Sequence, residues 1–137
     1  MKIEILDQPE PQLADFLLQK IVEFNWQHWE VSERLPLAAQ LKDQQGNVIA
    51  GASARTFGDW LLIDTLWVSE QLRGQNIGSQ ILAQIETAAI ARGCNKCLLD
   101  TLNFQARGFY QKHGYQVQWT QQGYPKTGAK HFMVKQL

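Results

Sequence analysis

The chain has 137 residues, 45% of them hydrophobic, a length that buries about two thirds of the unfolded surface in one core. A single domain spanning residues 1–137 is therefore expected. Thirteen Lys and Arg residues balance thirteen Asp and Glu residues, so no net field attracts nucleic acid or an anionic membrane, and neither partner is expected. All thirteen acids precede residue 101, whereas residues 101–137 carry five Lys or Arg residues and no acid.

The N-terminus lacks the features of a secretory signal, and no apolar run approaches the roughly 18 residues that span a bilayer. A cytoplasmic location is expected. Cys94 and Cys97 are the only cysteines, and His28, His113 and His131 do not complete a usual zinc set, so no metal site is expected. Cys97 falls inside an expected strand, where it fits as a small core residue.

The first elements are predicted by periodicity. Alternating polar and apolar residues predict a strand over 2–7, and apolar residues at helical spacing predict a helix over 11–24, after a proline suited to a first turn. Segment 25–36 has no clear period and is either a loop or a short helix. Its tryptophans, Trp26 and Trp29, are either core residues or a wall of a substrate site.

Three antiparallel strands are predicted next. The stretch 36–55 contains two strands around a polar turn at Gly46 and Asn47, and "DWLLIDTLWVSE" forms the third after Gly58. Apolar residues on one face then predict a helix over 77–91, which ends before the Arg92-Gly93 pair.

The C-terminal part completes an α/β pattern. "KCLLD" predicts a strand covered on both faces, 104–113 a helix, and "YQVQWT" and "KHFMVKQL" two closing strands. The expected order is β-α-β-β-β-α-β-α-β-β, in which one crossover helix joins two parallel strands.

The loop "LRGQNIGSQIL" precedes the helix over 77–91. A helix start exposes unpaired N–H groups to an anion, and Gly74 and Gly78 remove side-chain bulk there. Asn76 tolerates a left-handed backbone, and Arg73 adds a permanent cation. The loop therefore predicts a phosphate site, but its residues match neither a P-loop nor a dinucleotide fingerprint.

The pattern Arg-x-x-Asn-x-Gly over 73–78 resembles the pyrophosphate-binding signature of the GNAT superfamily of acyl-CoA-dependent N-acetyltransferases, usually written Q/R-x-x-G-x-G/A. Asn76 replaces its first glycine. "NFQARGFYQKHGY", 25 residues after Gly78, resembles the next helix of that family, with these matching positions: Asn103, Ala106, Phe109, Tyr110, Lys112, Gly114 and Tyr115.

The resemblance implies a mixed, mostly antiparallel sheet with a central splayed parallel pair, Trp60–Val68 and Lys96–Thr101, and flanking helices. It also implies acetyl-CoA as co-substrate, with the pantetheine paired to the strand edge at Leu66, Trp67 and Val68. The cofactor-binding residues it implies are Leu66, Trp67, Val68, Arg73, Gly74, Gln75, Asn76, Ile77, Gly78, Ser79, Asn103, Phe109, Tyr110 and Lys112.

Direct transfer in a ternary complex is implied, with Tyr110 as the acid that protonates the leaving thiolate; otherwise Tyr110 is a packed aromatic. A phenol has a pKa near 10 and a thiol near 8.5, so this transfer is uphill by about 2 kcal/mol in water. Asn103 either binds pantetheine or caps the helix. Asp64 is the candidate base, or else a substrate anchor or a solvent-facing acid. Asp100, in an apolar run, is expected to be structural.

The acceptor is less defined. Three functions remain open: acetylation of a small amine, acetylation of a protein, or non-catalytic binding of acyl-CoA. The small amine is preferred, because no extended charged run suggests protein docking. Acids such as Glu30, Glu33 and Asp64 predict a cationic acceptor. Loop 123–128 is expected to be mobile beside it, with Tyr124 at the substrate or in an exposed turn. Exposed Trp119 suggests a possible homodimer.

Overall fold

The computed structural model describes residues 1–31 and 33–137, and the chain forms two compact units, Met1–Ser32 and Glu33–Leu137. In the first unit, helix α1 spans Pro11–Trp26 with its proline in the first turn, which confirms the predicted helix. The strand predicted over 2–7 is wrong, because these residues have no regular structure. A strand needs a neighbour for its backbone hydrogen bonds, and the described part of this unit contains no other strand.

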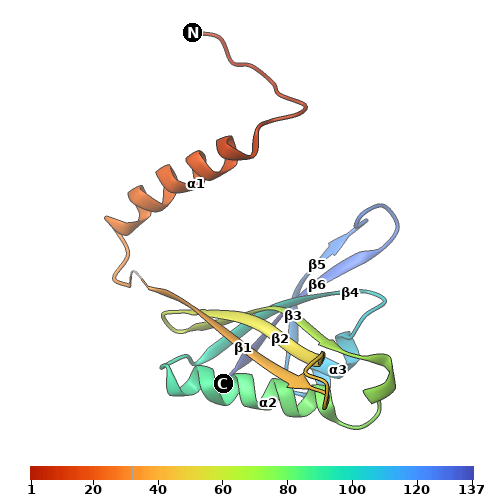
Figure 1. Cartoon of the computed structure of the whole chain (residues 1–137). Helices are drawn as coiled ribbons and strands as arrows, with labels where there is room; N and C mark the ends of the chain where they lie inside the picture. Colours follow the sequence, from red (N-terminus) through yellow and green to blue (C-terminus); the bar gives the residue numbers. More distant parts are fainter. Residues whose placement is uncertain (32) are drawn as a thin grey trace. The chain divides into compact units, whose positions relative to one another are not determined.

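The second unit is a six-stranded sheet in the order β1-β2-β3-β4-β6-β5 with helices α2 and α3 and a short 3-10 turn, η1 (Figure 1). The elements are β1 (Arg34–Lys42), β2 (Val48–Phe57), β3 (Trp60–Val68), η1 (Glu70–Leu72), α2 (Ile77–Ala91), β4 (Lys96–Leu102), α3 (Arg107–Lys112), β5 (Gln116–Gln122) and β6 (Ala129–Gln136). The strands β3 and β4 are parallel and the other neighbours are antiparallel. This arrangement confirms the predicted mixed α/β sheet.

Two elements, β1 and α3, have boundaries that differ from those predicted from the sequence. Strand β1 begins at Arg34, so part of the segment expected as a loop or short helix over 25–36 is extended. Helix α3 is shorter than the predicted 104–113. The side chain of Gln105 accepts the N–H of Leu102 at 2.7 Å, and the Thr101 hydroxyl accepts the N–H of Ala106 at 3.2 Å. These side-chain bonds hold a turn where the helix was expected to start.

The parallel pair is splayed, as the family resemblance implied. Residues of β3 and β4 pair at three positions that end with Leu62 and Leu98, although β3 continues to Val68 and β4 to Leu102. The register between β2 and β3 shifts where Ser53 pairs with Thr65 and Ala54 with Ile63, so Asp64 is the extra residue of a β-bulge. A bulge bends its strand, which carries the end of β3 away from β4.

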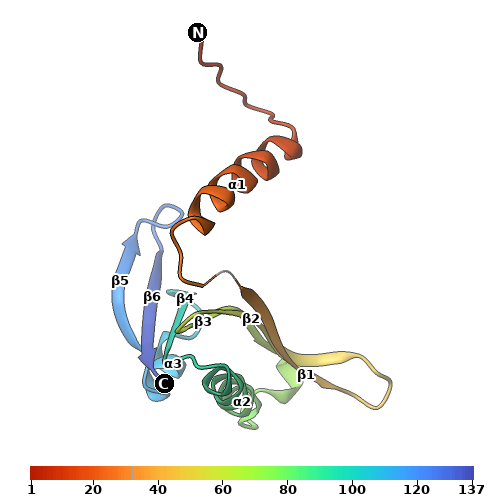
Figure 2. The same cartoon turned by 90° about the vertical axis from the view of Figure 1, so that its left-hand side faces the viewer.

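Helix α2 covers one face of the sheet (Figures 1 and 2). Small residues of β2 face it, and the predicted apolar face of the helix is buried against them: Ala50, Ala52, Ala54, Ile81, Leu82, Ile85 and Ala89. Cys97 is fully buried, as expected for a core residue, and burial raises the pKa of its thiol to about 12.

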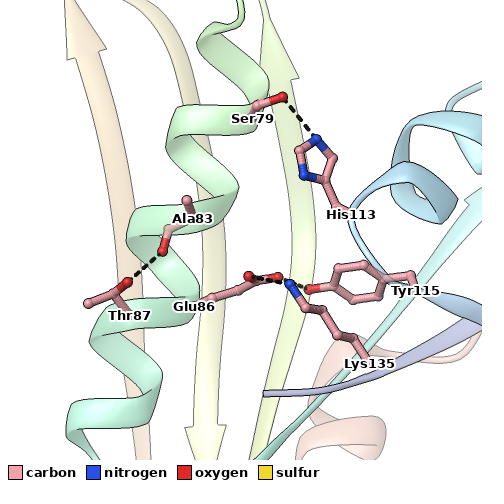
Figure 3. Close-up of polar contacts among 7 residues, drawn as sticks. All are labelled: Ser79, Ala83, Glu86, Thr87, His113, Tyr115 and Lys135. Atoms are coloured by element: carbon pink, nitrogen blue, oxygen red, sulfur yellow. Dashed lines mark hydrogen bonds and ion pairs between the residues drawn. The ribbon is translucent and has the colours of Figure 1, made fainter.

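One charged group lies in this core. Glu86 of α2 accepts a hydrogen bond from the Tyr115 hydroxyl at 2.7 Å and pairs with the Lys135 ammonium at 2.8 Å (Figure 3). Glu86 is 9% exposed and Tyr115 is 2% exposed. The Glu86 carboxylate is thus compensated at both oxygens and joins α2 to the C-terminal strands. Burial raises the pKa of Tyr115 far above that of a free phenol.

Candidate active site

A cavity of about 740 Å³ opens at the splayed ends of β3 and β4. The cavity is lined by strands β3 and β4, the loop before α2, the turn after β4, helix α3 and the β5–β6 hairpin. Its lining residues are Ile63, Asp64, Thr65, Leu66, Trp67, Val68, Arg73, Leu99, Asp100, Thr101, Leu102, Phe104, Gln105, Ala106, Tyr110, Tyr124 and Lys130. The cavity therefore brings Tyr110 of α3 close to Asp64 and the rest of the β3 edge, although Tyr110 lies more than 40 positions later in the sequence.

The edge of β3 along this cavity is open. Its pairing with β4 ends at Leu62, whereas its other side stays paired with β2 as far as Val68. Backbone N–H and C=O groups beyond Leu62 on the β4 side can therefore bond to an extended ligand. Leu66, Trp67 and Val68 lie on this stretch and line the cavity.

The start of α2 has the backbone that the sequence predicted. Asn76 caps the helix in the left-handed region, with φ of 67°, and is the one residue other than glycine with positive φ in the described chain. Gly74 has φ of 82°. The Arg73 guanidinium donates to the Val68 carbonyl at 3.4 Å, which ties this loop to the end of β3.

A second cavity of about 510 Å³ lies at this helix start. Its lining includes most of the predicted phosphate loop and one aromatic ring: Val68, Leu72, Arg73, Gly74, Asn76, Ile77, Gly78, Ser79 and Phe109. A Cβ on Gly78 would lie 3.4 Å from the Phe109 ring, an ordinary van der Waals distance, so α3 lies directly beside this turn of α2. Gln75 and Lys112 line neither cavity.

His113 lies beside the second cavity, although the sequence did not predict it as a site residue. Its Nε2 lies 2.9 Å from the Ser79 hydroxyl (Figure 3), and its ring lies 4.7 Å from that of Phe109. These contacts connect α2 and α3 beside the second cavity. Ser79 and His113 are 34 positions apart, and no sequence pattern predicted that they would pair.

Tyr110 has a buried ring, 7% exposed, that lines the main cavity. Edge-to-face contacts with Phe109 at 5.2 Å and Tyr115 at 5.7 Å fix its orientation. Burial, with smaller contributions from Cys97 and Asp100, raises the pKa of Tyr110 to about 12. Its hydroxyl therefore stays protonated, as a proton donor requires.

Two carboxylates line the cavity, and they differ in their partners. Asp64, at the bulge, accepts a hydrogen bond from the Arg55 guanidinium, and the two side chains are 47% and 45% exposed. Asp100 is exposed and lines the cavity, so the expectation of a strand covered on both faces is wrong at this position, and its structural role stays a prediction. Successive side chains of a strand point to opposite faces. Leu99 and Thr101 are buried on one face of β4, and Asp100, between them, is exposed on the other.

Asn103 does not line either cavity. Its Oδ1 accepts the N–H of Ala129 at 3.2 Å, and its own N–H donates to the Ala129 carbonyl at 2.9 Å. Asn103 thus connects the turn after β4 to the start of β6, next to the loop that carries Tyr124.

Four charged side chains line the main cavity: Asp64, Asp100, Arg73 and Lys130.

Within residues 1–31 and 33–137, no three His, Cys, Asp or Glu side chains are grouped to hold a metal ion. No helix in the part of the chain that the structure describes is long and apolar enough to cross a membrane.

Comparisons with known proteins agree with this architecture. Blasticidin-S acetyltransferase of Streptomyces morookaense is 35% identical over 95 residues, which cover 69% of this chain and 70% of that protein. An acetyltransferase from Bacillus cereus ATCC 14579 is 29% identical, with a TM-score of 0.88 over 98% of both chains. An aminoglycoside 6'-N-acetyltransferase complexed with coenzyme A has the same fold, with a TM-score of 0.66 and 18% identity over 99% of this chain and 97% of that one. Residues 3–115 match the acetyltransferase (GNAT) family, and the chain therefore belongs to this family of acyltransferases.

Proposed function

We propose that the protein transfers the acetyl group of acetyl-CoA to a primary amine of a small molecule, by direct attack in a ternary complex. The observation that carries this proposal is the open edge of β3, which runs from the cavity that contains Tyr110 to the start of α2. An extended pantetheine chain can pair with that edge. Its pyrophosphate then meets Arg73 and the free N–H groups of α2.

The chain's own residues supply the remaining steps. The neutral amine attacks the thioester carbonyl, and a backbone N–H on the open edge of β3 stabilises the oxyanion. When the carbon–sulfur bond breaks, Tyr110 donates its phenolic proton to the thiolate. A carboxylate of the cavity takes the proton that the amine loses and releases it to solvent, and solvent reprotonates Tyr110. The raised pKa of Tyr110 makes this proton transfer more unfavourable than it is in water. The fold must therefore hold the Tyr110 hydroxyl close to the sulfur on which negative charge develops.

Asp64 is our candidate for the group that takes the amine proton. It lies at the bulge where β3 leaves β4, and its exposed carboxylate lines the cavity. Its ion pair with Arg55 occupies one oxygen and leaves the other available to an ammonium group or a water molecule. Asp100 is a second candidate, because it lines the same cavity without such an ion pair in the described residues.

The experiment that tests this function is a panel of small amines, amino acids, polyamines and peptides, incubated with acetyl-CoA and assayed by release of free thiol. We expect a small amine to be the best acceptor. A peptide or protein as the best acceptor would replace the proposal with protein acetylation. Tight acetyl-CoA binding with no acceptor at all would indicate a binding module.

Cofactor binding is expected to depend on Arg73 and Gly78. The change Arg73→Ala should weaken acetyl-CoA binding by about 1–2 kcal/mol, because one charged hydrogen-bonded contact is lost. Gly78→Glu should weaken it further, since the new carboxylate repels the pyrophosphate at the helix start. Isothermal titration calorimetry measures both, with Gly78→Gln as the control that keeps the bulk without the charge. Equal affinity in all four proteins would exclude this loop as the pyrophosphate site.

Transfer to a cationic amine is expected to weaken as salt increases. Bound acetyl-CoA is expected to neutralise Arg73 through its pyrophosphate, which leaves Asp64 and Asp100 against Lys130 among the charged side chains that line the cavity. The two carboxylates then attract an ammonium ion, and the screening length falls from about 30 to 8 Å between about 0.01 and 0.15 M salt. We therefore expect kcat/KM for the amine to fall by about two- to tenfold over this range. Steady-state assays at fixed, saturating acetyl-CoA measure it. Kinetics that do not change with salt, or a best acceptor with net negative charge, would contradict the expectation.

A further inference from the structure

Loop 123–128 is restrained by a hydrogen bond within it and by two hydrogen bonds at its C-terminal end. The N–H of Tyr124 donates to the carbonyl of Gly128 at 3.0 Å, which closes the loop on itself. Asn103 then fastens the loop's C-terminal end through its two hydrogen bonds with Ala129. These bonds connect the loop to the turn after β4, and the mobility expected from the sequence stays a prediction.

Packing at Gly128 adds to the same restraint. A Cβ at this position would lie 2.6 Å from the Tyr124 carbonyl oxygen and 3.0 Å from Oδ1 of Asn103. Contacts this short force the backbone to shift, so only glycine lets the three residues approach one another. The loop and the Asn103 side chain therefore form one packed unit.

The consequence of this restraint appears in the cavity. Tyr124 and Lys130 both line it, and the Lys130 ammonium lies 4.3 Å from the centre of the Tyr124 ring. This cation–π contact fixes the ring from the β6 side. Asn103 itself stays outside the cavity lining, so its influence on a bound molecule passes through the loop.

We propose that Tyr124 forms a wall of the acceptor subsite and determines acceptor specificity, and that Asn103 is a positioning residue that holds this wall. The inference rests on the proposed acetyltransferase function, because it assigns a part of the same cavity. It differs from the role that the family resemblance implied for Asn103, which was a contact with pantetheine. The two roles predict effects on different quantities: loss of a positioning residue raises the KM for the amine, and loss of a pantetheine contact raises the Kd for acetyl-CoA.

Steady-state kinetics with acetyl-CoA and the best amine of the panel distinguish them. Asn103→Ala should raise the KM for the amine about tenfold, the factor that one lost hydrogen bond supplies, while the Kd for acetyl-CoA stays unchanged. Asn103→Asp keeps an oxygen acceptor for the Ala129 N–H and should restore the wild-type KM. Asn95→Ala is the matched control, since Asn95 precedes β4 and its backbone makes the hydrogen bonds there.

Two further variants separate positioning from general structural damage. Gly128→Ala displaces the loop from the other side and should reproduce the KM effect of Asn103→Ala. Tyr124→Leu should raise the KM by itself, and combining it with Asn103→Ala should add nothing further, because Asn103 acts through Tyr124. Additive effects, or a raised Kd for acetyl-CoA in Asn103→Ala with an unchanged amine KM, would overturn the proposal.

A readout without an acceptor keeps this test independent of the proposed function. Amide hydrogen exchange followed by NMR should show faster exchange at Tyr124 and Ala129 in Asn103→Ala, and wild-type rates in Asn95→Ala. Unchanged exchange at both amides would show that Asn103 does not hold the loop, which overturns the proposal. If the wild-type protein acetylates no amine, the proposed function fails while the exchange experiment still decides whether Asn103 holds Tyr124.

Discussion

Replacing Tyr110 with phenylalanine is expected to lower kcat by about 100-fold or more, the range that a general acid contributes. Only the hydroxyl is removed, and the buried ring keeps its edge-to-face contacts with Phe109 and Tyr115. The Kd for acetyl-CoA should therefore change little, because the proposed role of the hydroxyl exists in the transition state. Single-turnover kinetics with the best amine, together with calorimetric titration of acetyl-CoA, measure the two effects separately.

The pH dependence provides an independent check. Because burial raises the pKa of Tyr110 to about 12, its neutral phenol persists to higher pH than a free phenol, and kcat should not decline between pH 9 and 10.5, where an ordinary phenol begins to ionise. An alkaline limb near pH 10 that disappears in Tyr110→Phe would contradict the raised pKa. A kcat for Tyr110→Phe within about threefold of wild type would show that another group protonates the thiolate.

The sequence predicted best those parts of the fold that depend on local chemistry. Asn76 was singled out as a residue that tolerates a left-handed backbone, and it has φ of 67° at the start of α2. The apolar face of α2 was predicted from its period, and Ile81, Leu82 and Ile85 are buried as expected. Both features follow from residues close together in the chain.

The failures arise where structure depends on distant partners. The alternation over 2–7 satisfies the pattern of a strand, but a pattern does not supply the neighbouring strand that a sheet requires. Asp100 sits in an apolar run that was expected to be covered on both faces, yet it is exposed, whereas its neighbours Leu99 and Thr101 are buried. The run "KCLLD" predicts a strand between two layers, but it does not reveal that one side opens into a cavity.

In the candidate site, too, some residues could be predicted from the sequence and others could not. Family resemblance assigned Tyr110, Arg73 and the edge of β3 to one site, and the structure places them along two cavities that share Val68 and Arg73. The contacts of Asn103 with Ala129 and of Ser79 with His113 could not be predicted, because each joins segments that meet only in the folded protein. The catalytic and binding roles of these residues remain predictions that the experiments above test.

The charged group in the core is where a single substitution should affect stability most. The Glu86 side chain is 12% exposed and that of Lys135 is 25% exposed, so water compensates the Glu86 carboxylate poorly. The stem of Lys135 also packs over Gly114, with its Cε 3.5 Å from where a Cβ would lie. Methionine at position 135 retains most of this packing but removes the ammonium. Glu86 would then keep one donor, the Tyr115 hydroxyl.

We therefore expect Lys135→Met to lower the free energy of unfolding by about 3 kcal/mol, the lower part of the range for breaking a buried pair. Urea unfolding at pH 7 measures it, with Lys42→Met as an exposed control that should change stability by less than about 0.5 kcal/mol. Combining Lys135→Met with Glu86→Gln should recover much of the loss, because the uncompensated charge is removed while the amide oxygen still accepts from Tyr115. If the double variant is no more stable than Lys135→Met alone, packing of the lysine stem, rather than the stranded carboxylate, accounts for the destabilisation. A loss below about 1 kcal/mol in the single variant would place Glu86 in contact with water, as in an exposed ion pair.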